Sequence, residues 1–75
     1  MGVNYKRLWK RLIDEEIETT VLHTNTGVAP STLTKMRKNE YVSLDVLVRI
    51  CKFLNCQLSD IVEVELNSRI FLSEL

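Results

Sequence analysis

The side chains best suited to bind a polar, charged ligand gather in a short stretch that begins near Pro30. Four of them share one side of a helix at this spacing: Ser31, Thr34, Lys35 and Lys38. Their hydroxyl groups can donate or accept hydrogen bonds, and their ammonium groups carry positive charge. Leu33 and Met36 fall on the opposite side, where they can anchor the helix from beneath. This pattern predicts a helix whose polar face is free to contact DNA.

A glycine turn and a second helix must position that face. We expect the preceding helix over about residues 19–25, and we expect the polar helix to begin near Pro30, since proline suits a first helical turn. Gly27 supplies the backbone freedom that lets the chain reverse. Val28 fills the angle between the two helices, and Leu22 closes the first helix against the core. The spacing therefore predicts a helix-turn-helix.

A first helix is predicted from about Asn4, which can cap it, to about Glu15. Five apolar residues at helical spacing form its inner side: Tyr5, Leu8, Trp9, Leu12 and Ile13. Four basic residues fall together on the other side: Lys6, Arg7, Lys10 and Arg11. We interpret these charges as a solvated face in preference to a DNA contact surface. We interpret Trp9 as a core anchor in preference to a stacking platform.

Two further helices are predicted after the helix-turn-helix. Asn39 is expected to end the polar helix in the left-handed conformation, and Ser43 is expected to cap the next helix, which ends near Asn55. The buried stripe of that helix is expected to comprise Leu44, Leu47, Ile50, Cys51 and Leu54. Ser59 and Asp60 would start a short fifth helix. The fold class is therefore all-α, with five helices.

The C-terminal residues change their period. Residues 62–66 alternate apolar and polar side chains, which is typical of a strand, and residues 69–72 are again apolar enough to need a partner. Our hypothesis is that this tail pairs with its copy in a second subunit, and the alternative is local packing over the first and fifth helices. We therefore divide the chain into a helix-turn-helix domain at 1–65 and a tail at 66–75, a possible dimerisation segment.

Composition supports one small cytoplasmic domain. The 75 residues suffice for a single modest core, and the sequence shows neither a signal peptide nor an apolar run of membrane-spanning length. The formal net charge is zero, although DNA-binding proteins are usually basic. Residues 1–41 hold seven basic and five acidic side chains, whereas residues 42–75 hold three basic and five acidic ones. This distribution weakly favours one basic face.

The sequence argues against catalysis and against a metal or cofactor. His23, predicted on the exposed side of its helix, has no carboxylate or thiol partner in a triad-like arrangement, and no glycine-rich phosphate loop occurs. Cys51 and Cys56 are five residues apart, so on a helix they would face different directions. A metal site needs about four ligands, and the chain has one histidine to add to these cysteines. We expect two buried or half-buried thiols.

The joint spacing over residues 4–63 resembles the helix-turn-helix domains of Cro and the phage repressors, also called xenobiotic-response-element-like regulators. Residues 5–13 and 40–47 are most similar to the first-helix and fourth-helix patterns of a compact, single-domain subgroup. The resemblance implies a lambda-repressor-like fold and a transcriptional regulator, a repressor that binds double-stranded DNA as a homodimer. The alternative is a protein-binding modulator or antirepressor on the same fold, which would engage another regulator protein.

The resemblance also implies which residues touch DNA, because in this family the second helix of the motif lies in the major groove. The reading positions of the family fall on Pro30, Ser31, Thr32, Thr34 and Lys35. Lys35 is the strongest candidate for the O6 and N7 acceptors of guanine. Lys38 and Asn39 would approach phosphate where the helix ends. Thr19 and Thr20, suited to cap the preceding helix, would hold another phosphate with hydroxyl and N–H groups.

The reading positions depart from the family in one respect. Relatives frequently carry glutamine at one or two of them, whereas this chain has Pro30 and Ser31, which make fewer distinct hydrogen bonds. Direct readout by one subunit should therefore be modest. Specificity would then depend on two half-sites bound by a dimer.

Overall fold

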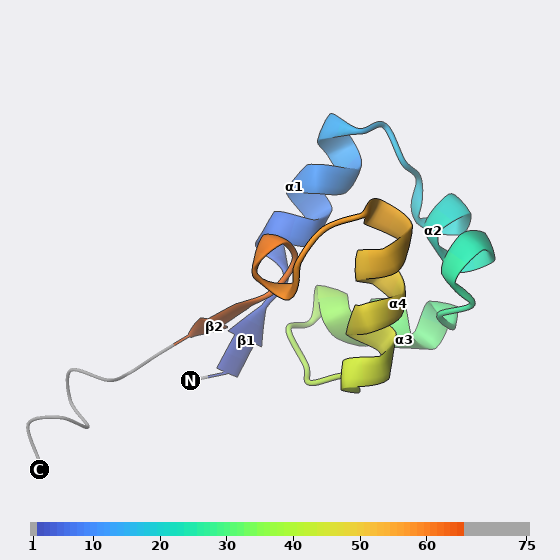
Figure 1. The fold of residues 1–75 in the computed structure, drawn as a ribbon. Coiled ribbons are helices and arrows are strands. Elements are labelled where there is room, and N and C mark those ends of the chain that lie inside the picture. Colours follow the sequence, from blue (N-terminus) through green and yellow to red (C-terminus); the bar gives the residue numbers. More distant parts are fainter. Residues whose placement is uncertain (1, 66–75) are drawn as a thin grey trace, which may run out of the picture.

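Four α-helices carry most of residues 2–65, the part of the chain that the computed structural model describes (Figure 1). Their bounds are α1 Lys6–Asp14, α2 Thr19–Thr26, α3 Pro30–Arg37 and α4 Leu44–Leu54. A single 3-10 turn, η1, follows at Leu58–Asp60. Two short strands, β1 Gly2–Asn4 and β2 Glu63–Glu65, form an antiparallel pair in which Val3 lies opposite Val64. No helix in this part of the chain is long and apolar enough to cross a bilayer.

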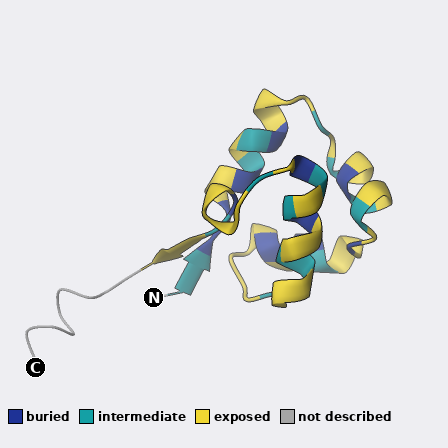
Figure 2. Cartoon of the chain, in the orientation of Figure 1, coloured by how far each residue is buried: buried dark blue, intermediate teal, exposed yellow. Residues whose placement is uncertain are grey.

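The core lies where the four helices meet, and every helix contributes to it (Figure 2). Its buried side chains are Tyr5, Leu8, Leu12, Leu22, Val28, Leu33, Met36, Ile50, Leu54 and Ile61. Burying a side chain of leucine size stabilises a fold by about 1.5–3 kcal/mol, so these residues supply the main driving force for folding. The predicted anchors of the helix-turn-helix, Leu22, Val28, Leu33 and Met36, are confirmed as buried.

Two residues predicted in the core are exposed instead. Ile13 exposes 75% of its surface and Leu44 exposes 61%. Ile13 lies in the last turn of α1, where Leu12 beside it is buried and Ile13 lines an open hollow. Leu44 is the first residue of α4, and full burial on that helix begins only at Ile50. Helical spacing identified the correct stripes but not where neighbouring elements stop covering them.

The predicted fifth helix is a single 3-10 turn, so the five-helix assignment is wrong in this respect. Gln57 and Asp60 close the turn with a reciprocal capping box, in which the N–H of Gln57 donates to Oδ2 of Asp60 at 2.9 Å. Ile61 then enters the core, and the chain is already extended at Glu63. Because burial and strand pairing follow at once, only one turn has room to form.

The fold is not all-α, because β1 and β2 form a small sheet. The strand signal at residues 62–66 is confirmed for Glu63–Glu65, and β2 pairs with β1 of its own chain. The Nδ2 of Asn4 donates to Oε2 of Glu65 at 3.1 Å and fastens this pair. Residues 66–75, the assigned dimerisation segment, lie outside the described residues.

The helix ends follow the predicted caps in part. Ser43 caps α4 by accepting from the N–H of Val46 at 3.3 Å, and Asn39 follows α3 with φ 59°, in the left-handed region. Both predictions are confirmed. Thr19 and Thr20 are wrong as caps, because Glu18 occupies the N-cap position of α2 and makes no capping hydrogen bond with its side chain. The extended backbone at Glu18 places both threonines inside the first helical turn.

Candidate nucleic-acid interface

The turn between α2 and α3 is held by hydrogen bonds on both sides of Gly27. Gly27 has φ 74° and ψ 8°, and its N–H donates to the carbonyl of His23 at 2.9 Å. The next N–H, that of Val28, donates to Oγ1 of Thr26 at 3.2 Å. The Nδ1 of His23 lies 2.6 Å from the carbonyl oxygen of Val28. His23 is half-buried, so our prediction that it lies on the exposed side of its helix is wrong. The turn therefore fixes the direction in which α3 leaves α2.

The outer face of α3 carries the polar residues that the sequence placed there. The four side chains Ser31, Thr34, Lys35 and Lys38 are all exposed, as are Pro30 before them and Asn39 after them. Thr32 is half-buried. The hydroxyl of Thr34 donates to the carbonyl of Pro30 at 3.1 Å, which leaves its oxygen lone pairs free to accept a hydrogen bond. The exposed face thus offers one hydroxyl pair and two ammonium groups.

A shallow hollow of about 210 Å³ joins the start of α2 to the outer face of α3. Its lining residues are Thr19, Thr20, His23, Pro30, Leu33, Thr34 and Arg37. The structure therefore brings the threonine pair together with Pro30 and Thr34, although these residues are more than nine positions apart in sequence. Lys35, Lys38 and Asn39 do not line this hollow and lie on the remainder of the α3 face and its end.

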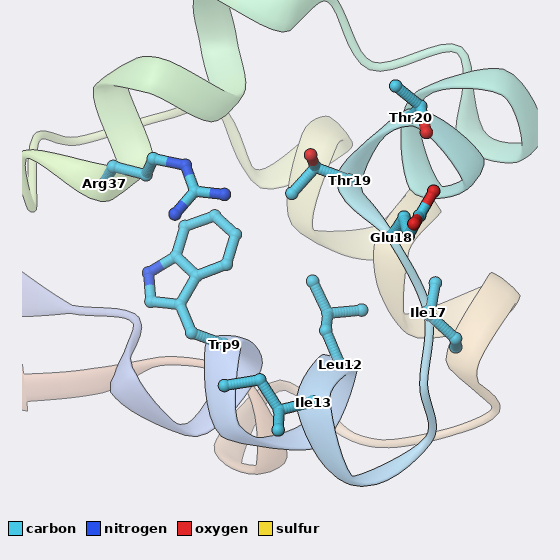
Figure 3. Close-up of a pocket in the computed structure, with 8 residues that line it drawn as sticks. All are labelled: Trp9, Leu12, Ile13, Ile17, Glu18, Thr19, Thr20 and Arg37. Atoms are coloured by element: carbon cyan, nitrogen blue, oxygen red, sulfur yellow. The ribbon is translucent and has the colours of Figure 1, made fainter.

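A second, larger hollow of about 490 Å³ lies beside the first, between the end of α1, the start of α2 and the end of α3 (Figure 3). Arg37 and Trp9 form one wall of it: the guanidinium carbon of Arg37 lies over the indole, 4.5 Å from the ring centroid. Thr19 and Thr20 line both hollows. Trp9 packs against the core, as predicted, and its ring also serves as the platform for Arg37.

Arg37 is a candidate interface residue that the sequence analysis missed. It follows Pro30 and Thr34 at intervals of seven and three residues, so helical spacing alone places it on their side of α3. Lys35 and the cluster around it lie on an adjacent side of α3. The position of Arg37 relative to Trp9 depends on how α1 packs against α3, and helical spacing does not report that packing.

The charges of α1 and α3 differ in their partners. On α1, Lys10 pairs with Asp14 at 3.4 Å, Arg11 with Glu15 at 2.9 Å and Arg7 with Glu63 at 3.9 Å. These three neutralised pairs agree with a solvated face; Lys6, the fourth cation of α1, forms no ion pair within residues 2–65. On α3 and its end, the cations Lys35, Arg37 and Lys38 form no ion pair with any acidic group in residues 2–65. Positive charge is therefore concentrated at α3 even though the chain is neutral overall.

The start of α2 adds donors to this basic surface. Since Glu18 does not cap the helix, the first N–H groups of α2 have no side-chain acceptor among the described residues. Such N–H groups, together with the positive end of the helix dipole, favour an anion nearby. Thr19 and Thr20 lie at this end and add hydroxyl groups, beside Arg37 in both hollows. The arrangement is able to hold a phosphate group next to α3.

The two cysteines lie together, away from this surface. α4 ends at Leu54, Asn55 adopts φ 54°, and the N–H of Cys56 donates to the carbonyl of Cys51 at 3.0 Å. Because the helix ends between them, the prediction that the thiols face different directions is wrong, although both are half-buried as expected. Burial, with a smaller contribution from the neighbouring Cys56, raises the pKa of the Cys51 thiol to about 11. This thiol is therefore protonated near neutral pH.

Comparisons with known proteins agree with this geometry. A family model described as the Cro/C1-type HTH DNA-binding domain matches residues 7–67. The crystal structure of the transcriptional regulator VanUg is similar to this chain, with 47% sequence identity over 85% of each chain and a TM-score of 0.81. Comparison with curated proteins finds no match. The chain belongs to the family of Cro/C1-type helix-turn-helix DNA-binding domains.

Proposed function

We propose that this chain is a sequence-specific transcriptional repressor that binds double-stranded DNA as a homodimer through α3. The observation that carries the proposal is the contrast in charge pairing. Three of the four cations of α1 have acidic partners, whereas Lys35, Arg37 and Lys38 have none within residues 2–65. Unpaired cations beside exposed hydroxyl groups suit a polyanion with hydrogen-bonding groups in its groove.

In this proposal, α3 lies in the major groove with its first turns against base edges. The reading residues are Pro30, Ser31, Thr32, Thr34 and Lys35. Lys35 donates to guanine, and the methyl group of Thr34 meets a thymine methyl. Thr19, Thr20, Lys38 and Asn39 contact phosphate groups on either side, and Arg37 joins them, because it lines both hollows beside the threonines.

The limited readout of one subunit supports a dimer. A good base contact contributes about 1–3 kcal/mol of discrimination, and α3 has few side chains that can make one. We propose that residues 66–75 provide the pairing between subunits. Removing residues 66–75 and measuring the mass in solution tests this: a full chain of dimer mass and a shortened chain of monomer mass support it, whereas equal oligomeric states contradict it.

Selection of bound duplexes from a random DNA pool tests the function directly. We expect an inverted repeat whose half-sites are centred about 10 base pairs apart, since two copies of α3 would enter successive major grooves on one side of the DNA. Enrichment of a single, asymmetric half-site would contradict the dimer. Failure to enrich any sequence would contradict specific readout. A reporter gene placed behind the selected sequence then shows whether binding represses transcription.

One observation favours the alternative function, a modulator that binds another regulator. Tyr41, Leu44 and Val48 expose 73%, 61% and 37% of their surfaces, and the last two lie one turn apart on α4. An exposed apolar stripe of this kind suits a protein partner. The salt dependence of DNA binding separates the two functions, because several phosphate contacts give a steep decline in affinity as salt rises. Absence of DNA binding at low salt would favour the modulator.

A further inference from the structure

His23 lines the hollow between α2 and α3, and the protonation of one of its ring nitrogens is fixed by a neighbouring carbonyl group. Its Nδ1 lies 2.6 Å from the carbonyl oxygen of Val28. A carbonyl oxygen accepts hydrogen bonds and cannot donate one, so Nδ1 must carry a proton whether the ring is neutral or charged. In the neutral ring, the other nitrogen, Nε2, is then left with a lone pair.

The surroundings of His23 suit an anion more than a cation. His23 lines the hollow that Thr19, Thr20, Thr34 and Arg37 also line. Within residues 2–65, no hydrogen bond engages Nε2. The one charged residue of α3 in this lining is Arg37, and no acidic side chain belongs to it. Arg49 of α4 lies beside Gly27 at the back of the turn, where it pairs with Asp45 at 3.0 Å.

We infer that His23 is a proton-dependent phosphate contact that couples DNA binding to pH. The inference rests on the proposed DNA-binding function and adds a form of regulation to the same surface. In the neutral ring, Nε2 has a lone pair and cannot donate to a phosphate oxygen. When the ring takes up a second proton, Nε2 becomes a donor and the ring becomes a cation. Because Val28 fixes the first proton on Nδ1, the contact requires the second.

Two quantitative consequences follow for binding. Affinity for DNA rises as pH falls, since the bound state holds one more proton per subunit than the free state. The added phosphate contact also steepens the salt dependence, so the slope of log K against log salt becomes more negative by about 0.9 per subunit. A loss of turn geometry would lower affinity without producing either effect.

The experiment uses the full chain and a labelled duplex of random sequence, about 20 base pairs long, because phosphate contacts do not depend on sequence. Affinity is measured at about pH 5.5 and about pH 8, each at several salt concentrations. His23→Asn is the matched variant, because its amide N–H can still donate to the Val28 carbonyl but it does not titrate. We expect binding of the wild-type chain to tighten by about three- to tenfold at the lower pH, and the variant to lose this gain.

Each outcome has one meaning. The same pH profile and salt slope in the wild-type chain and in His23→Asn would overturn the inference while leaving DNA binding intact. No binding by the wild-type chain at any pH and low salt would overturn the proposed function itself, and the inference with it. If the variant does not fold, the wild-type chain still gives a test, since His23 is its single histidine and its ring signals in NMR need no assignment. A proton on Nε2 of the neutral ring, or a titration that DNA leaves unmoved, would then overturn the inference.

Discussion

The guanidinium group of Arg37 lies over the indole ring of Trp9, with a distance of 4.5 Å between its Cζ and the ring centroid. This stack joins the end of α3 to α1, beside the first turn of α2 (Figure 3). The face of an aromatic ring attracts a cation without neutralising its charge. Trp9 therefore holds Arg37 in place and leaves its charge available to a phosphate group.

Replacing Arg37 should weaken DNA binding for all sequences alike. We expect Arg37→Ala to make the slope of log K against log salt less negative by about 0.9 per subunit, because one phosphate contact is lost. Trp9→Leu should weaken DNA binding less than Arg37→Ala does, because the charge of Arg37 remains but the indole ring no longer holds it in place. Lys10→Ala is the control: it also removes one cation, but from an ion pair with Asp14 on α1. Equal losses in Lys10→Ala and Arg37→Ala would show that only total charge matters.

The two lysines of the α3 region should differ in what they change. Lys35→Ala is expected to relax base preference at one position of each half-site, at a cost of about 1–3 kcal/mol for the preferred base. Lys38→Ala should weaken binding to every sequence by a similar factor, because it contacts phosphate. Affinities of both variants for a set of singly substituted duplexes distinguish these effects. Indistinguishable patterns would contradict the assigned roles.

The left-handed turn at Gly27 should tolerate asparagine better than alanine. At φ 74°, a residue with a side chain is strained, and we expect Gly27→Ala to lower the free energy of unfolding by about 1–2 kcal/mol. The added Cβ would lie 3.6 Å from the nearest atom of Arg49, an ordinary contact, so the cost comes from the backbone. Gly27→Asn is the control, since the chain already places Asn39 and Asn55 in this conformation. Equal losses in both variants, measured by urea unfolding, would point to crowding instead.

The Cys51 thiol should make stability depend on alkaline pH. Its pKa is raised by burial from 9.0 to about 11, so the folded state favours the protonated form. The contribution to stability is fully present below pH 9 and is lost as the pH rises through about 11. Because alkaline pH also affects stability in other ways, the useful quantity is the difference in unfolding free energy between the wild-type chain and Cys51→Ala. We expect their difference in unfolding free energy to change between these pH values, and a constant difference would contradict the raised pKa.

The sequence by itself determined the helix-turn-helix. Leu22, Val28, Leu33 and Met36 are buried at the predicted positions, and Asn39 is left-handed as predicted. These features depend on local rules, because helical periodicity and the conformational preferences of single residues act over one or two turns. The sequence could also have placed Arg37 on the side of α3 that carries Pro30 and Thr34, since that too is periodicity.

Only the tertiary structure decided which residues from different elements meet. It placed Arg37 over Trp9, paired β2 with β1 of the same chain and left Ile13 exposed. It also set the ring of His23 against the carbonyl of Val28. Such contacts depend on where one helix stops covering another and on how sharply the chain turns between them. Helical periodicity predicts which face of a helix is apolar, but it does not predict which element packs against that face. The packing and the ion pairs that depend on it are therefore visible only in the folded structure.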